Sequence, residues 1–238
     1  MILVGEGFSP WTEKARWALE HHHLEHAYVE YTPLVSELWL RRRARKWRGK
    51  ISVPYLLGPP DAADSFAIAR QADRIGDGTP LVPAELEPEI TAWNDRAERL
   101  MRAGRSMILA RTEENVELQR ASLPPALPEA MRRVLAPTVR IGTGYLRKKY
   151  AVTLVPDEAM ENDLNAVRAA LANGDHLLER FTLADIAIAC ALQVLRPHPT
   201  FPRGISREQR AGWARPALAA RFEDLLAWRD RLVAEHRR

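Results

Sequence analysis

Short apolar runs and alternating segments occupy the first third of the chain, and longer helical periodicities occupy the rest. Alternating or continuous apolar segments predict strands, and apolar residues at three- and four-residue spacing predict helices. We expect strands at residues 1–4, 26–32, 51–57 and 61–64, and helices at residues 10–22, 34–47 and 65–75. Because a helix separates the first two strands, they should be parallel and joined by a right-handed crossover.

Strand signals almost vanish after residue 88. Three prolines punctuate the stretch from Gly76 to Pro88, which predicts an interdomain linker at residues 78–87. Beyond it we expect helices at residues 87–113, 126–150, 156–172, 183–195 and 214–236. The pattern therefore predicts a small α/β domain at residues 1–77 and an all-helical domain at residues 88–238.

Composition adds few constraints on function. The chain has 238 residues, of which 46% are hydrophobic and 28% charged, with a net charge of +4. A surplus this small is compatible with anionic small ligands and does not by itself indicate nucleic acid. Cys190 is the only cysteine, which excludes an internal disulfide and indicates a reducing compartment. With no signal peptide or spanning segment predicted, we expect a cytoplasmic protein without a membrane partner.

The turn between the first predicted strand and helix is the most informative stretch. Ser9 is a preferred N-cap residue, and Pro10 suits the first helical position. Such a helix start directs free N–H groups, and the positive end of the helix dipole, at one point beside a hydroxyl. A thiolate, a carboxylate or a phosphate would be favoured there.

Four motifs then define a resemblance. They are the turn Phe8-Ser9-Pro10-Trp11 with Lys14 and Arg16, the pairs Val53-Pro54 and Asp64-Ser65, and the helix start Phe181-Thr182-Leu183-Ala184-Asp185-Ile186. Together they resemble cytosolic glutathione S-transferases over essentially the whole chain. The resemblance implies a thioredoxin-like α/β N-terminal domain followed by an all-α C-terminal domain. It also implies a homodimer that transfers the thiolate of glutathione, its co-substrate, to a small hydrophobic electrophile.

By this resemblance, Ser9 would bind the glutathione sulfur and lower the pKa of its thiol, since a hydroxyl donor stabilises the thiolate. Because serine cannot form a mixed disulfide, conjugation is favoured over thiol exchange. Two alternatives remain open. In the first, Ser9 serves only as an N-cap, which contributes roughly 1 kcal/mol to stability. In the second, the hydroxyl of Thr12 binds the sulfur instead.

The resemblance also assigns the rest of the glutathione site. It implies a cis bond at Val53-Pro54, whose Val53 backbone would pair with the cysteinyl backbone of glutathione as an added strand does. Asp64 and Ser65 would hold the γ-glutamyl group, with Ser65 at its carboxylate and Asp64 at its ammonium. Asp64 stands where the family more often has glutamate.

A basic run at residues 41–50 is the most unusual composition in the chain. The resemblance implies that one of its members, Arg41, Arg42 or Lys50, contacts the glycine carboxylate of glutathione. Trp39 and Trp47 interleave with these charges, a pattern that also suits nucleic acid. The run is short and the overall charge is modest, so nucleic acid is not the expected partner.

Three further expectations concern the remaining chemistry. The electrophile pocket is assigned by domain position to Trp93, Arg96, Met101 and Arg105. His21, His22, His23 and His26 lack a third ligand at metal spacing, and no metal is expected. Cys190 should be an inert core thiol. The main alternative to a transferase is a non-catalytic module that keeps the fold for binding or assembly.

Overall fold

The computed structural model describes residues 1–33, 35–124, 127–202 and 205–237. Its N-terminal part is a four-stranded mixed sheet in the order β2-β1-β3-β4, with β1 parallel to β2 and antiparallel to β3. The strands and helices here are β1 (Ile2–Gly5), α1 (Pro10–His21), β2 (Ala27–Glu30), α2 (Glu37–Arg43), β3 (Tyr55–Leu57), β4 (Ala62–Ala63) and α3 (Ser65–Ile75). The predicted parallel βαβ unit is confirmed.

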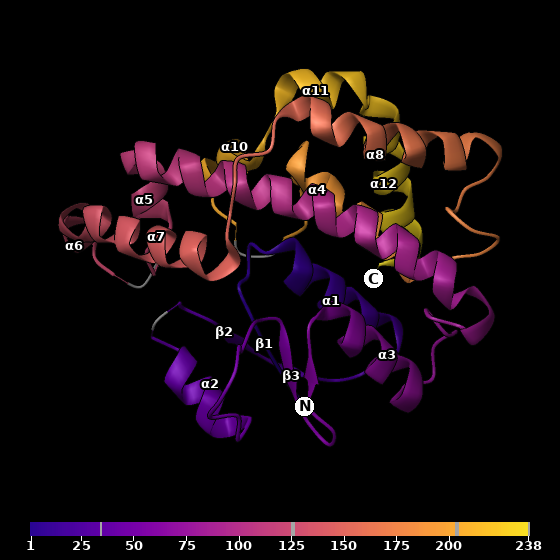
Figure 1. The fold of residues 1–238 in the computed structure, drawn as a ribbon, viewed down its shortest axis with the longest axis horizontal. Coiled ribbons are helices and arrows are strands. Elements are labelled where there is room, and N and C mark those ends of the chain that lie inside the picture. Colours follow the sequence, from indigo (N-terminus) through magenta and orange to yellow (C-terminus); the bar gives the residue numbers. More distant parts are fainter. Residues whose placement is uncertain (34, 125–126, 203–204, 238) are drawn as a thin grey trace.

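Helices cover both faces of this sheet (Figure 1). Leu3 and Leu56 point to the face on which α1 and α3 pack. Val4 and Tyr55, their neighbours along the strands, point to the other face and meet Leu40 of α2. Successive side chains along a strand point to opposite faces of the sheet, so neighbouring apolar residues pack in different layers.

The rest of the chain is helical and lies against α1 and α3, so these two helices separate the sheet from the helical part (Figure 1). Its elements are α4 (Glu87–Glu114), α5 (Val116–Ala121), α6 (Glu129–Leu135), α7 (Val139–Tyr150), α8 (Asp157–Ala170), α9 (Leu183–Ala191), α10 (Arg207–Trp213), α11 (Pro216–Arg221) and α12 (Glu223–His236). This arrangement, a small α/β sheet followed by helices, confirms the predicted fold class. The bounds of the linker at 78–87 stay a prediction.

Helix α9 is the centre of the core and is buried along its whole length between α1 and α4. Its start is a capping box, in which Thr182 Oγ1 accepts from Ala184 N at 3.3 Å and Asp185 Oδ2 accepts from Thr182 N at 2.8 Å. Asp185 Oδ1 also accepts from Leu177 N at 2.8 Å. The buried carboxylate therefore fixes both the helix start and the chain before it.

Several predicted helices are shorter or interrupted. The basic helix expected at 34–47 ends at Arg43, where like charges crowd successive turns, and Arg45 takes a left-handed φ of 51°; Leu34 lies outside the described residues. The helix expected at 126–150 is divided near Pro137 into α6 and α7; residue 126 lies outside the described residues. The helix expected at 214–236 is divided at Phe222, and α5 and α10 were not predicted.

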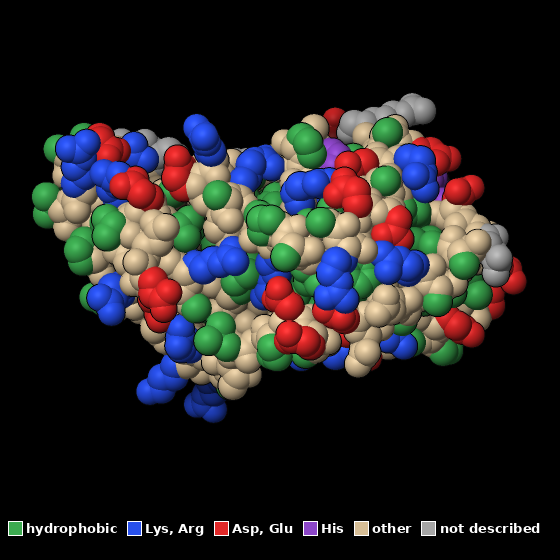
Figure 2. Space-filling model, turned by 90° about the horizontal axis from the view of Figure 1, so that it is seen from above, with side chains coloured by type: hydrophobic (Ala, Val, Ile, Leu, Met, Phe, Trp, Pro, Cys, Tyr) green, Lys and Arg blue, Asp and Glu red, His purple; other side chains and the backbone are tan. Residues whose placement is uncertain are grey.

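The surface carries mixed charge. On the face that the helical part presents in Figure 2, Lys and Arg alternate with Asp and Glu, and no single sign gathers. Within the described ranges, no helix combines the length and the apolarity needed to cross a membrane.

Candidate functional site

The sheet brings the predicted site residues together at one end. The register pairs Gly5 with Glu30 and Val4 with Tyr55, so Pro54, which precedes Tyr55, lies beside Gly5. Asp64 N donates to Pro54 O at 3.1 Å, so the segment that enters α3 lies beside the start of β3. The end of β1, the start of β3 and the start of α3 therefore lie side by side, and the turn that leads to Ser9 leaves from the middle of this row.

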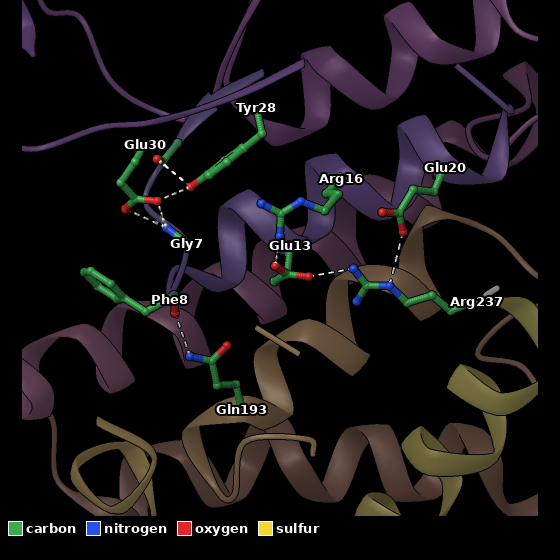
Figure 3. A network of polar contacts seen from close by, with 10 residues as sticks. Gly7, Phe8, Glu13, Arg16, Glu20, Tyr28, Glu30, Gln193 and Arg237 are labelled. Atoms are coloured by element: carbon green, nitrogen blue, oxygen red, sulfur yellow. Dashed lines mark hydrogen bonds and ion pairs between the residues drawn. The ribbon is translucent and has the colours of Figure 1, made fainter. Parts of the chain in front are cut away.

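The turn itself is held at three points, and Figure 3 shows those at Gly7 and Phe8. Gly7 N donates to both carboxylate oxygens of Glu30, at 3.0 and 3.2 Å. Gln193 Nε2, from the helical part, donates to Phe8 O at 2.9 Å. Ser9 N donates to Glu6 O at 3.0 Å. Because both parts of the molecule bind this turn, the position of Ser9 is set by the assembled fold.

Ser9 is 7% exposed, in an extended conformation directly before α1, and its hydroxyl makes no capping hydrogen bond to that helix. Its backbone carbonyl accepts from Glu13 N at 3.1 Å and opens the helix. Thr12, the alternative hydroxyl, is fully buried, and its side chain packs against Gly5, where a Cβ atom would lie 2.6 Å from it. Of these two residues, only Ser9 retains some exposure to solvent.

The Val53-Pro54 peptide bond is cis, as the resemblance implied. Pro54 and Ser65 are buried, and Val53 is half-buried. Asp64 is exposed and caps α3, with Oδ1 accepting from Ala67 N at 2.9 Å. Its φ of 71° and ψ of 158° form a backbone conformation that L-residues rarely adopt. Such outliers cluster at ligand sites, since the surrounding structure must hold them in place.

The three basic candidates differ in how they are placed. Arg41 donates to Glu37 Oε1 from Nε and Nη2 at 3.0 and 2.9 Å, and also to the carbonyls of Lys46 and Gly49. Arg42 is exposed on the surface. Lys50 places Nζ 4.7 Å from the ring centroid of Tyr150, at the end of α7. The guanidinium of Arg41 is thus bonded to neighbouring residues of its own segment, whereas Lys50 faces the space between the two parts.

Contacts across that space tie the α/β part to the helices. Trp11 Nε1 donates to both Glu98 carboxylate oxygens at 2.9 Å, and the buried Lys14 Nζ donates to Asn94 Oδ1 at 2.7 Å. On the far side, Tyr145 O–H donates to Glu37 Oε2 at 2.7 Å. This hydrogen bond contributes most to lowering the pKa of Glu37 to about 2.

The expected electrophile-pocket residues divide into two groups. Met101 is fully buried in the core, and its assignment to the pocket stays a prediction. Trp93 packs against the same core, and Arg96 donates to Asp163 Oδ1 at 2.9 Å. Arg105 contacts the helix that begins beside Ser9, since its guanidinium lies 4.8 Å from the ring centroid of Trp11.

Glu6, Tyr150 and Lys149 were missed by the sequence reasoning. Burial, followed by the negative charge of Glu30, raises the pKa of the Glu6 carboxyl to about 7. Arg105 and Lys149 oppose this shift with their positive charges. The only sequence signal for Glu6 is an acidic residue between the first strand and the Ser9 turn. A partly protonated carboxyl therefore lies beside the candidate site.

This pKa predicts a pH-dependent stability. Between pH 4.5 and about 7 the folded state holds a proton on Glu6 that the unfolded chain releases, so its contribution to stability falls as pH rises through that window. The Glu6→Gln variant should be more stable than the wild type at pH 8, by roughly 1 to 3 kcal/mol. The difference should disappear near pH 4.5. Urea unfolding at both pH values measures it, and an equal difference at the two would contradict the assignment.

The histidines each have a partner of their own. His22 Nε2 lies 2.7 Å from Asp73 Oδ1, and Asp73 also accepts from Leu81 N and Val82 N, so this pair holds the chain between α3 and α4. His21 and His23 contact Thr79 O and Asp77 Oδ1. In the described part of the chain, no three His, Cys, Asp or Glu side chains form a metal-binding group.

Cys190 is fully buried in α9, and burial raises the pKa of its thiol to about 12. It therefore stays protonated at neutral pH, as expected of an inert core thiol.

Comparison with known proteins identifies the fold. No family model matches the chain, and no curated protein matches its sequence. Solved glutathione S-transferases match its structure throughout. One from Methylobacillus flagellatus with glutathione bound is 16% identical, with a TM-score of 0.56, over 98% of this chain and 94% of that one. One from Methylobacterium radiotolerans, in complex with glutathione sulfonate, is 21% identical, with a TM-score of 0.55, over 98% and 90%.

A further match, a glutathione transferase family member from Pseudomonas fluorescens with S-(propanoic acid)-glutathione bound, is 17% identical, with a TM-score of 0.54, over 98% of this chain and 94% of that one. The chain therefore has the glutathione S-transferase fold. At these identities the likeness defines the fold, and the chemistry must be argued from this chain's own residues.

Proposed function

We propose that this protein binds glutathione at the end of its sheet and transfers the thiolate to a small electrophile. The observation that carries the proposal is the row formed by the Ser9 turn, the cis Val53-Pro54 bond and the start of α3 at Asp64. Three structures of this fold with glutathione or a derivative bound support it.

In this proposal each group has one task. The Val53 backbone pairs with the cysteinyl backbone, and the start of α3 receives the γ-glutamyl group. There Ser65 and the first N–H groups of the helix take the carboxylate, while Asp64 takes the ammonium. Lys50 is the basic residue we assign to the glycine carboxylate, because Arg41 is already bonded to Glu37. The Ser9 hydroxyl donates to the sulfur and stabilises the thiolate, which is then held against the electrophile.

Binding of glutathione is the first test. Millimolar glutathione should raise the melting temperature, because a ligand that binds only the folded state stabilises it. A mixture of free glutamate, cysteine and glycine at the same concentrations serves as the control. Lack of any shift, together with no heat in calorimetric titration, would end the proposal and leave the non-catalytic alternative.

The Ser65→Ala variant should weaken glutathione binding by roughly 10- to 100-fold, since a hydrogen bond to a charged group contributes about 1.5–3 kcal/mol. Calorimetric titration measures the change. Ser122→Ala is the matched control, because its hydroxyl donates to Leu118 O at 2.8 Å, in another part of the molecule. Equal affinities for the two variants would remove Ser65 from the site.

The proposed partners are glutathione, a hydrophobic electrophile and a second copy of the chain. Sedimentation of the purified protein tests the homodimer.

A further inference from the structure

A cavity of about 530 Å³ lies between α4, α8 and the segment that joins α7 to α8. Its walls are partly apolar, with Leu100, Val152, Val155 and Met160 among them. Three arginines on successive turns of α4, Arg99, Arg102 and Arg105, also line it. A mostly apolar hollow with a few fixed charges is the usual form of a small-molecule site.

The three arginines are not equally available. Arg99 is neutralised by Asp163, with its Nη2 at 2.7 Å from Oδ1 and its Nε at 2.9 Å from Oδ2. Arg102 lies 3.8 Å from Glu98, which also accepts hydrogen bonds from Trp11. Arg105 has no carboxylate at ion-pair distance anywhere in the described ranges, and its Nε is buried without a hydrogen-bond partner there.

Aromatic rings fix the Arg105 guanidinium in place. Its Cζ lies 4.2 Å from the ring centroid of Tyr150 and 4.8 Å from that of Trp11. Cation–π contacts of this kind orient the guanidinium while leaving its N–H edge available for hydrogen bonds. Trp11 belongs to the same helix start as Ser9, so Arg105 connects the cavity to the proposed sulfur site.

We propose that the electrophile is an organic carboxylate and that Arg105 selects it. The inference rests on the proposed transfer function and names its substrate class. A planar guanidinium matches a carboxylate with two parallel hydrogen bonds. The apolar walls suit the carbon skeleton of the same molecule, which favours an organic acid over an inorganic anion. Desolvation, the main influence on Arg105, lowers its pKa but leaves it charged at neutral pH, since an arginine is protonated there.

Two electrophiles that differ in one substituent, an anionic carboxylate or a neutral carboxamide, test this selectivity. With 4-chloro-3-nitrobenzoate and 4-chloro-3-nitrobenzamide, the thiolate sulfur bonds to the carbon that bears chlorine, chloride leaves with the bonding pair, and the thiol proton goes to solvent. Each rate is divided by its uncatalysed rate with glutathione. We expect kcat/KM for the benzoate to exceed that for the benzamide at least 10-fold, consistent with a charged hydrogen-bonded pair.

Arg105→Gln should bring this ratio close to one by lowering the benzoate value alone, and Arg105→Lys should retain part of the preference. Arg140→Gln removes the same charge from an exposed position on α7 and should leave the ratio unchanged. A ratio that Arg105→Gln does not alter would overturn the inference, even if both compounds are conjugated.

Direct binding separates this inference from the transfer function. Calorimetric titration with the unreactive 3-nitrobenzoate, without glutathione, should show binding that Arg105→Gln weakens at least 10-fold, and 3-nitrobenzamide should bind weakly to both proteins. If neither chlorinated compound is conjugated but this pattern holds, the transfer function is wrong and the carboxylate site stands. If 3-nitrobenzoate binds no better than its amide, the site is wrong whatever the activity.

Discussion

Replacing Ser9 by alanine is expected to lower kcat/KM for glutathione conjugation by roughly 10- to 100-fold, because the variant loses a hydrogen bond to a charged sulfur. Stability should barely change, since the Ser9 hydroxyl makes no capping hydrogen bond. This combination separates the two interpretations of Ser9. A side chain that served only as a cap would cost about 1 kcal/mol of stability on removal and leave the rate unaltered.

A second substitution at the same position tests its location. In Ser9→Cys, the new thiolate should attack the disulfide of oxidised glutathione, forming a protein–glutathione disulfide and releasing one glutathione thiolate. Mass spectrometry of the intact protein detects this adduct. Cys190 provides an internal control, because it is fully buried and the wild type should form no adduct. Equal labelling of the two proteins would place the sulfur elsewhere.

Replacing Glu13 by glutamine should give the largest loss of stability. The Glu13 carboxylate is fully buried between two arginines, bonded to Arg16 and, at 2.6 Å, to Arg237 Nη2 (Figure 3). Removing one partner of a buried pair costs about 3–5 kcal/mol, since the remaining charges stay desolvated. For a chain of this length that corresponds to a fall in Tm of roughly 10 °C.

Glu20→Gln is the matched control. Glu20 accepts from Arg237 Nε at 3.3 Å, but its side chain is 23% exposed, so solvent screens the interaction. We expect it to cost less than about 1 kcal/mol. Urea unfolding of both variants measures the difference. A Glu13→Gln effect no larger than that of Glu20→Gln would mean that the buried network adds nothing to stability.

Local chemistry explains what the sequence could predict. The starts of α3 and α9 are capped by the nearby side chains of Asp64 and of Thr182 with Asp185, and Pro10 marks the start of α1. Capping depends on side chains and backbone groups that are close in sequence, so such signals survive in any fold that contains the helix. The parallel pairing of β1 and β2 likewise follows from the length of their connection.

Contacts between distant segments explain what could not be predicted. Arg105 meets Trp11 and Tyr150 only after both parts of the chain have packed. The charged residues Glu13 and Lys14 lie in α1, which is covered by the sheet on one side and by the helical part on the other. A polar face normally indicates which side of a helix is exposed to solvent. Because α1 is buried on both sides, its charged residues do not mark such a face, and their burial becomes evident only from their partners in the folded structure.

The acidity of bound glutathione tests the central claim most directly. Thiolate absorbance in the ultraviolet, followed as pH is raised with the protein saturated by glutathione, gives the pKa of the bound thiol. We expect a value at least one unit below the ordinary thiol pKa of about 8.5, and a return to that ordinary value in Ser9→Ala. A bound thiol that titrates identically in both proteins would contradict it.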